Sequence, residues 1–168
     1  MGNRLSQRQA DVLEFVRSFV ATRGRHPKYQ ELVNGMSLTL GYAHELIKRL
    51  RDKGYLLRGD PTTRGNIPIY LTERVPVLPP LKRIVNVVRC DRRLNAQQRG
   101  IIRILATSAS NGFLPPKYDA IASRVGLSLH SSVSYHVGRL IAAGYLAPDP
   151  LQDQIVWLAP SFLSRLAA

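Results

Sequence analysis

Two polar stretches of the chain, residues 39–48 and 128–135, carry the side chains best suited to recognising another molecule. Hydroxyl groups donate and accept hydrogen bonds, and histidine and tyrosine side chains reach further from the backbone. These groups suit contacts with base edges in a DNA major groove, where Glu45 would accept from the amino group of cytosine. The candidates for base contact are Thr39, Gly41, Tyr42, His44, Glu45, Lys48, Ser128, His130, Ser131, Ser132, Ser134 and Tyr135.

A second set of candidate residues is basic and suits phosphate groups rather than bases. The chain has 24 Lys and Arg against 11 Asp and Glu, which gives a net charge of +13 and a pI near 10.7. This excess of positive charge creates an electrostatic field that attracts a polyanionic partner, either nucleic acid or an anionic membrane surface. The phosphate candidates are Arg49, Arg51, Arg58, Arg64, Lys82, Arg83, Arg89, Arg92, Arg93 and Arg139.

Enzymatic and metal sites find little support in the residue pattern. The sequence contains no Gly-rich phosphate loop ending in Lys and Ser or Thr, no His-x-x-x-His pair and no closely spaced carboxylates suited to acid–base work. Cys90 is the only cysteine, which excludes an internal disulfide and a multi-cysteine zinc site. The four histidines do not have the spacing of metal ligands. We therefore expect no enzyme activity, no metal and no cofactor.

Length and composition are those of an ordinary globular protein. A chain of 168 residues allows one average domain or two small ones, and 45% hydrophobic with 21% charged residues argues against disorder. No apolar run approaches the roughly 18 residues of a membrane span, and residues 1–7 lack the apolar segment of a signal peptide. We expect no membrane partner and a cytoplasmic, nucleoid-associated protein.

The two halves of the chain repeat each other. Residues 5–9 match residues 94–98 at an offset of 89, and residues 27–29 match residues 116–118 at the same offset. Further on the offset is 90, because Leu50 and Gly54 match Leu140 and Gly144. The one-residue slip is expected between residues 35 and 39, where a turn would absorb it. An internal repeat of this size predicts two copies of one small fold.

Hydrophobic spacing predicts the same elements in each copy. A first helix follows the N-cap candidates Ser6 and Asn95, and a short second helix follows Pro27 or Pro116. After a turn, the third helix buries a stripe with i, i+4, i+7 spacing. Thr39 and Ser128 are also suited to capping this helix. The stripes are Ala43, Ile47 and Leu50 in the first copy and Val133, Val137 and Leu140 in the second.

Each copy then ends in a predicted β-hairpin. The first pairs residues 55–58 with residues 67–71, where Pro68 suits an edge strand, and the second pairs residues 145–147 with residues 155–158. The second turn carries Asp149 and Asp153 and no basic residue, so it would repel phosphate. Trp157 is expected in the core.

Three helices followed by a hairpin form the winged helix-turn-helix plan, whose third helix enters the major groove. We therefore predict a mainly α protein with small β-hairpins (α+β), made of two tandem winged helix-turn-helix domains. The expected boundaries are residues 1–74, a Pro-rich then basic linker at 75–93, and residues 94–168. Residues 81–88 are compatible with a short strand or a short helix.

The first copy resembles the DNA-binding domain of LexA repressors. The resemblance lies in residues 5–9, the hydrophobic first helix, Gly24 with Pro27, Glu31-Leu32 and the ending at residues 50–54. In the second copy, residues 121–126 followed by His136, Leu140 and Gly144 keep that domain's helix-turn-helix spacing. A LexA repressor carries one such domain followed by a self-cleaving Ser/Lys protease domain, whereas this chain repeats the winged helix there. The resemblance implies DNA reading by the third helix and does not imply autoproteolysis.

The prediction is a sequence-specific double-stranded DNA-binding protein, a bacterial or phage transcriptional regulator that uses the third helix of each domain. One alternative is a plasmid or phage replication-initiation or DNA-maintenance protein. Another gives the second domain a docking or dimerisation role, because its hairpin is acidic and residues 158–163 are apolar. Protein partners or self-association through the second domain therefore stay open.

Overall fold

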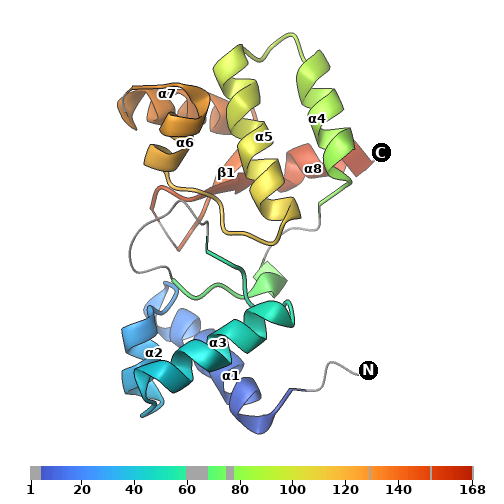
Figure 1. Ribbon diagram of the computed structural model, residues 1–168. Helices are drawn as coiled ribbons and strands as arrows, with labels where there is room; N and C mark the ends of the chain where they lie inside the picture. The colour runs from blue at the N-terminus through green and yellow to red at the C-terminus, as the bar shows by residue number, and fades with distance from the viewer. Residues whose placement is uncertain (1–4, 60–67, 75–77, 129, 152, 168) are drawn as a thin grey trace. The chain divides into compact units, whose positions relative to one another are not determined.

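Helices account for most of the backbone that the structure describes, and they fall into two compact units (Figure 1). The computed structural model describes residues 5–59, 68–74, 78–128, 130–151 and 153–167. Unit 1 contains the described residues up to 74, and unit 2 contains those from 78 onward. Each unit has a hydrophobic core of its own.

Among its described residues, unit 1 contains three α-helices, a 3₁₀ turn and a short extended pair. Its elements are α1 (Gln7–Arg23), α2 (Tyr29–Gly35), α3 (Leu40–Asp52) and the 3₁₀ turn η1 (Thr72–Arg74). The Ser6 hydroxyl accepts from the Gln9 amide and the Gln9 side chain accepts from the Ser6 amide, which confirms the predicted cap of α1. Gly24 ends the helix with a φ of 63°, a left-handed conformation that glycine adopts without strain.

The hairpin of unit 1 is shorter than predicted among the residues that the structure describes. Leu56 and Leu71 form an isolated antiparallel bridge, and the Leu57 amide donates to the Tyr70 carbonyl. The Ile69 amide donates instead to the carbonyl of Pro27, so this segment also joins the loop before α2. Residues 60–67, which include Arg64 and the expected tip, lie outside the described residues.

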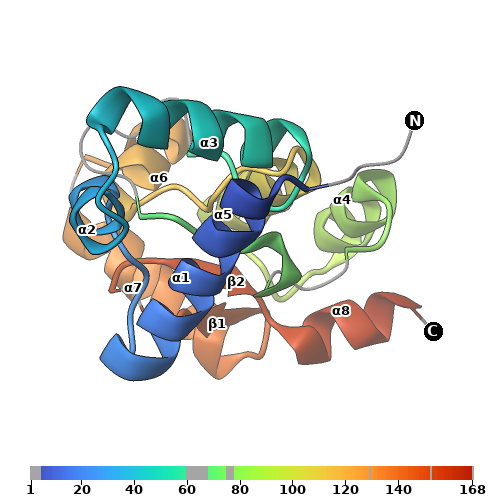
Figure 2. The ribbon, with the colours of Figure 1, turned by 90° about the horizontal axis from the view of Figure 1, so that it is seen from below.

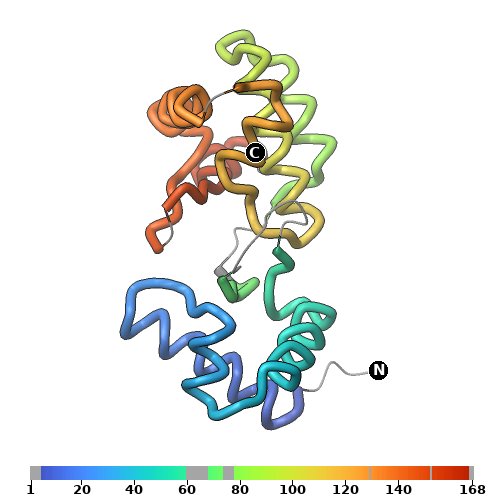
Figure 3. The backbone as a smooth tube through the Cα atoms, turned by 60° about the vertical axis from the view of Figure 1, so that its left-hand side comes forward, coloured from blue at the N-terminus to red at the C-terminus, as the bar shows by residue number. Residues whose placement is uncertain are grey.

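Unit 2 contains five helices and a two-stranded antiparallel sheet among its described residues. The elements are α4 (Leu81–Cys90), α5 (Ala96–Ser110), α6 (Tyr118–Val125), α7 (His130–Ala142), β1 (Leu146–Pro148), β2 (Val156–Leu158) and α8 (Pro160–Ala167). Asn95 is the N-cap of α5, as predicted, and it forms a capping box with Gln98. Figure 3 shows the backbone path from α5 through α6 to α7, followed by the hairpin. The strands pair Leu146 with Leu158 and Pro148 with Val156.

The segment expected to be a basic linker is in part a packed helix. Residues 81–90 form α4, which packs against α5 and α8 (Figure 2). Ile84 and Val88, four residues apart, are buried in the core of unit 2, with Leu81 packed beside them. Burial of this apolar stripe stabilises the helix and resolves the choice between strand and helix. The linker prediction for residues 81–90 is therefore wrong, and this part belongs to unit 2.

The apolar C-terminal stretch is also buried rather than exposed. Phe162, Leu163 and Leu166 of α8 belong to the core of unit 2, so residues 158–163 do not form the free docking surface considered from the sequence. The predicted position of Trp157 is wrong as well. Val156 and Leu158 enter the core, whereas Trp157 is half-buried and its Nε1 donates to the Asp149 carboxylate over 2.7 Å.

The turns before α3 of unit 1 and α7 of unit 2 share a backbone conformation. Ser37 and Gly126 both have a positive φ, and the amides of Leu38 and Leu127 donate to the carbonyls of residues five positions earlier. These pairs are 89 positions apart, whereas the helices α3 and α7 begin 90 positions apart. The slip therefore follows residue 38, at the end of the predicted interval of residues 35–39.

The structure confirms a mainly helical α+β chain with one small antiparallel sheet. None of the described helices is both long enough and apolar enough to cross a membrane.

Candidate nucleic-acid interface

Helix α3 separates its residues into a buried face and an exposed face. Ala43, Ile47 and Leu50, the predicted stripe, are fully buried, and Leu46 joins them in the core of unit 1. The base-contact candidates of this copy therefore project from the other side of the helix. Gly41, Tyr42, His44, Glu45 and Lys48 are all exposed.

The N-terminal turn of α3 presents apolar side chains to solvent. The Thr39 hydroxyl accepts a hydrogen bond from the Tyr42 amide over 3.4 Å and so caps the helix. Capping was one of the two roles predicted for Thr39, and base contact was the other. Leu40 is 52% exposed and Tyr42 is 42% exposed. Apart from its two chain neighbours and the backbone of its own helix, a Cβ atom at Gly41 would meet no atom within 4 Å, so no other part of the protein covers this position. Large exposed apolar side chains on one helical turn indicate a contact surface.

Leu40 was not among the residues singled out from the sequence. A leucine at the start of a helix usually faces the core, and the polar pattern around it drew attention to Thr39 and Tyr42 instead. The spacing gave no signal of this exposure, because a residue three positions before Ala43 lies next to the buried stripe on a helix. An exposed leucine suits apolar contact with a thymine methyl group.

Tyr29, the first residue of α2, holds two of the candidate residues of α3. The His44 ring stacks on the Tyr29 ring with a centroid separation of 4.5 Å. Arg51 donates from Nη1 to the Tyr29 hydroxyl over 3.1 Å and from Nε to the Leu57 carbonyl over 3.1 Å. Burial raises the pKa of the Tyr29 hydroxyl, and nearby Arg51 opposes that shift. Arg51 is thus part of the scaffold that orients α3.

Other basic side chains of unit 1 pair with carboxylates at the surface. Arg49 pairs with Glu45 one turn earlier, and Arg58 pairs with Asp52 at 3.2 Å. Exposed pairs of this kind contribute about 0.2–1 kcal/mol, so a phosphate group can displace the carboxylate at small cost. Arg49 and Arg58 therefore remain suitable phosphate ligands.

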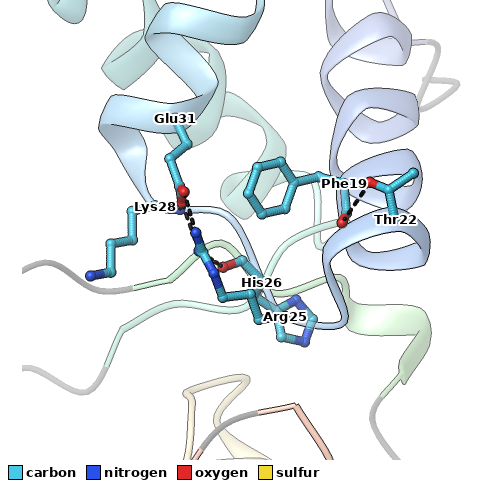
Figure 4. Close-up of polar contacts among 6 residues, drawn as sticks. All are labelled: Phe19, Thr22, Arg25, His26, Lys28 and Glu31. Atoms are coloured by element: carbon cyan, nitrogen blue, oxygen red, sulfur yellow. Dashed lines mark hydrogen bonds and ion pairs between the residues drawn. The ribbon is translucent and has the colours of Figure 1, made fainter.

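An ion pair between Arg25 and Glu31 joins the start of α2 to the loop before it (Figure 4). The Glu31 carboxylate also accepts from the Lys28 amide over 2.9 Å, and the Arg25 guanidinium lies 5.2 Å from the Phe19 ring centroid of α1. The hydrogen bonds from Arg25 lower the pKa of Glu31 to about 2. These contacts orient α2 relative to α1 and so support α3.

In unit 2, α7 occupies the place of α3 in the chain order. Tyr135 is 60% exposed, and its hydroxyl accepts from Arg139 Nη1 over 3.1 Å. His130 and Ser131 are also exposed, while Ser134 donates to the His130 carbonyl over 3.3 Å. Ser132 is half-buried, and Ser128, in the preceding turn, is exposed. Tyr118 at the start of α6 packs its ring against His130 at 5.3 Å, as Tyr29 does against His44.

The basic residues expected on a linker lie instead on or just after α4. Lys82, Arg83 and Arg89 are exposed on that helix, and Arg92 and Arg93 are exposed in the turn that follows. The described residues contain no group of three or more histidine, cysteine, aspartate or glutamate side chains that could hold a metal ion.

Comparison with known proteins finds relatives for the N-terminal part of the chain. The LexA DNA binding domain family matches residues 2–65. The LexA repressor of Bacillus velezensis is 35% identical over 85 residues, which are 50% of this chain and 40% of that protein. The LexA repressor of Bacillus subtilis is 36% identical over the same extent, and that of Mycobacterium ulcerans is 35% identical over 66 residues, 27% of its length.

The matched region thus covers 40% or less of the length of these relatives. The family match includes the described helices α1, α2 and α3, and it does not extend to α5, α6 or α7. Residues 2–65 of this chain are therefore similar to the LexA DNA binding domain.

Proposed function

We propose that this protein is a sequence-specific double-stranded DNA-binding transcriptional regulator that reads the major groove with α3. The observation that carries the proposal is the match of residues 2–65 to the LexA DNA binding domain, because that match contains an exposed helix face suited to base edges. Leu40, Tyr42 and Lys48 are the residues to which we assign the contact. Arg49, Arg58 and Arg64 would bind phosphates, whereas Arg51 is assigned a scaffold role.

The second part of the proposal is that α5–α7 with β1 and β2 form a second winged helix. Support comes from capping boxes 89 positions apart at Ser6 and Asn95, and from the matching turns at Ser37 and Gly126. In this reading α7 would present Ser131, Tyr135 and Arg139 to DNA. The residues of α4, with their positive charge, would contact phosphates between or beside the two sites.

A selection from a random duplex library, followed by a salt titration on the enriched sequence, tests the proposal. With about 6–10 phosphate contacts, affinity should fall roughly 10³–10⁵-fold between 50 and 200 mM salt. A regulator should enrich one motif that lies in promoters of its host genome, whereas a replication initiator should enrich repeats at an origin. No enriched motif and a flat salt response would contradict DNA reading altogether.

A further inference from the structure

A pocket of about 220 Å³ lies in unit 2 between α4, the turn after it and α8. Its charged lining residues are Arg83 of α4, Asp91 and Arg93 of the turn, and Arg165 of α8. Three guanidinium groups against one carboxylate give this lining a formal net charge of +2. Arg165 was not among the residues singled out from the sequence. None of the lining residues belongs to α3 or α7, so the proposed base reading does not use this pocket.

The acidic side chain of the pocket takes its hydrogen bonds from uncharged donors. Asp91 Oδ1 accepts from the Arg93 backbone amide over 2.9 Å, and Asp91 Oδ2 accepts from the Tyr145 hydroxyl. The hydrogen bond from Tyr145 is the main cause that lowers the pKa of Asp91, so the carboxylate is ionised at neutral pH. Burial raises the pKa of Tyr145, and Asp91 adds to this shift, so the hydroxyl keeps its proton and remains a donor. Among the described residues, the Asp91 carboxylate therefore needs no guanidinium group as a hydrogen-bond donor.

The three arginine side chains keep N–H donors that no protein group uses. Within the described part of the chain, the guanidinium groups of Arg83, Arg93 and Arg165 form no hydrogen bond and no ion pair. Unit 1 differs, because four of its arginines pair with carboxylates. The Arg165 guanidinium lies 5.6 Å from the ring centroid of Tyr145 and 5.8 Å from that of Phe162. These rings attract its charge and hold it beside the pocket without supplying a hydrogen-bond acceptor.

We propose that this pocket binds the terminal phosphate group of a small phosphorylated molecule, a function beyond DNA recognition. Guanidinium groups bind phosphate oxygens in a bidentate manner, and the pocket brings three of them together. A phosphate monoester carries a charge of about −1.5 to −2 at pH 7, which matches the +2 of the lining, whereas a DNA backbone phosphate carries about −1.

The size of the pocket also suits a terminal phosphate group. Its volume of about 220 Å³ is several times the roughly 30 Å³ that one water molecule occupies in the liquid, so a phosphate group of five heavy atoms has room to enter. A backbone phosphate is bonded to DNA on two sides and cannot enter a pocket in this way. In the complex, Arg83 and Arg93 would serve the ligand, whereas Lys82 and Arg89 of α4 would stay free for DNA.

Nuclear magnetic resonance on the ¹⁵N-labelled full chain tests the proposal with two defined probes. Methyl phosphate is a monoester with a terminal phosphate group, and dimethyl phosphate is a diester that represents the DNA backbone. In a phosphate-free buffer, we expect methyl phosphate to shift the backbone amides of Val87, Asp91 and Leu166 and to bind at least tenfold more tightly than dimethyl phosphate. Equal affinities, or shifts spread over the basic surfaces of both units, would show only general attraction of anions and overturn the proposal.

Substitutions of single arginines localise the site. Arg165→Gln should weaken methyl phosphate binding at least tenfold, and Arg83→Gln should weaken it severalfold. The matched control Arg103→Gln removes the same charge from an exposed position on α5 that does not line the pocket, so affinity should change less than twofold. Trp157 fluorescence during unfolding checks that each variant of unit 2 is folded.

The Arg165 side chain also contacts two rings, so its loss could affect folding. Should Arg165→Gln fail to fold, the comparison of Arg83→Gln with Arg103→Gln still decides, because both side chains are exposed. Equal weakening by all of these substitutions would place phosphate binding outside the pocket.

Further measurements separate this inference from neighbouring ones. A phosphoserine peptide that binds at least tenfold more tightly than methyl phosphate would overturn a small ligand in favour of a phosphorylated protein. DNA affinity of Arg165→Gln should equal that of the wild-type protein, and a tenfold loss would assign the pocket to the DNA backbone instead. If methyl phosphate binds the pocket while no DNA motif is enriched, the proposed DNA function fails and the phosphate site stands. The opposite pattern removes the phosphate site and leaves DNA reading intact.

Discussion

Ser37 of unit 1 and Gly126 of unit 2 both have a left-handed backbone conformation, with φ of 51° and 72°, at the turns before α3 and α7. The two residues are 89 positions apart, and each is followed by a leucine whose amide closes the turn. Glycine adopts this conformation freely, whereas a residue with a Cβ atom is strained by about 1–2 kcal/mol. Unit 1 therefore carries strain at a position where unit 2 does not.

We expect Ser37→Gly to stabilise unit 1 by about 0.5–1 kcal/mol, because relief of strain exceeds the added flexibility of the unfolded chain. Gly126→Ser should destabilise unit 2 by about 1–2 kcal/mol. Urea unfolding followed by Trp157 fluorescence reports on unit 2, since the chain has one tryptophan, and circular dichroism reports on both units. A loss of stability in Ser37→Gly would mean that the Ser37 side chain contributes more than its strain costs.

The exposed apolar pair at the start of α3 should carry sequence discrimination. Leu40→Ala and Tyr42→Ala should each reduce the affinity difference between the selected duplex and a scrambled duplex by about 1–3 kcal/mol, if each reads a base. Both side chains are largely exposed, so unfolding free energy should change by no more than about 0.5 kcal/mol. Equal weakening on both duplexes would assign these residues to backbone contacts instead.

Gly41 offers a test of close approach between α3 and DNA. At Gly41, and at Gly138 of α7, an added methyl group would meet no atom within 4 Å apart from its chain neighbours and the backbone of its own helix. Gly→Ala at either site should therefore add up to about 0.5–1 kcal/mol of helix stability. On the enriched duplex, Gly41→Ala should lower affinity roughly tenfold, about 1.4 kcal/mol, because its methyl group would meet the bases. Competition binding with both variants checks this. Unchanged affinity in Gly41→Ala would place DNA away from the first turn of α3.

Lys48 and Arg51, both basic residues of α3, should behave differently. Lys48→Ala should reduce the affinity difference between the selected duplex and a scrambled duplex by about 1–3 kcal/mol and leave stability unchanged, as expected for an exposed base contact. Arg51→Ala should destabilise unit 1 by about 1–3 kcal/mol, because it leaves the Tyr29 hydroxyl and Leu57 carbonyl without their donor. Thermal unfolding and anisotropy titrations on the same preparations distinguish the two roles. A reversal of the two phenotypes would contradict the scaffold role of Arg51.

The Arg25–Glu31 pair predicts a dependence of unit 1 stability on pH. Folding lowers the pKa of Glu31 from an ordinary 4.5 to about 2, so the charged carboxylate favours the folded state. This contribution is fully present above pH 4.5 and is lost as the pH falls toward 2. Glu31→Gln should therefore be less stable than the wild-type protein at pH 7, with a difference that shrinks between pH 4.5 and pH 2. Urea unfolding of both proteins at several pH values measures this difference in the free energy of unfolding. A difference that does not change with pH would exclude the ion pair as its cause.

Local patterns were sufficient to predict the helices that carry the candidate interface. The caps at Ser6 and Asn95 were identified from residue type alone, since a side-chain oxygen next to an apolar repeat satisfies the free amides of a helix start. The stripes beginning at Ala43 and Val133 correctly separated buried from exposed faces. Residues 81–90 were ambiguous because a short apolar run suits a strand or a helix, and only packing against α5 and α8 decides between them.

What the sequence by itself determined was local: the helix caps, the buried stripes, the repeat and the excess of positive charge. Tertiary structure decided which candidate side chains were already engaged, as with Arg51 on Tyr29, because these contacts join residues 22 positions apart. It also decided that the Phe15 ring of α1 packs directly over Gly35 of α2, a contact between residues 20 positions apart. The spacing of apolar residues in a sequence indicates which positions face another helix. The volume left between two packed helices depends on all the side chains in the contact, which only the tertiary structure shows.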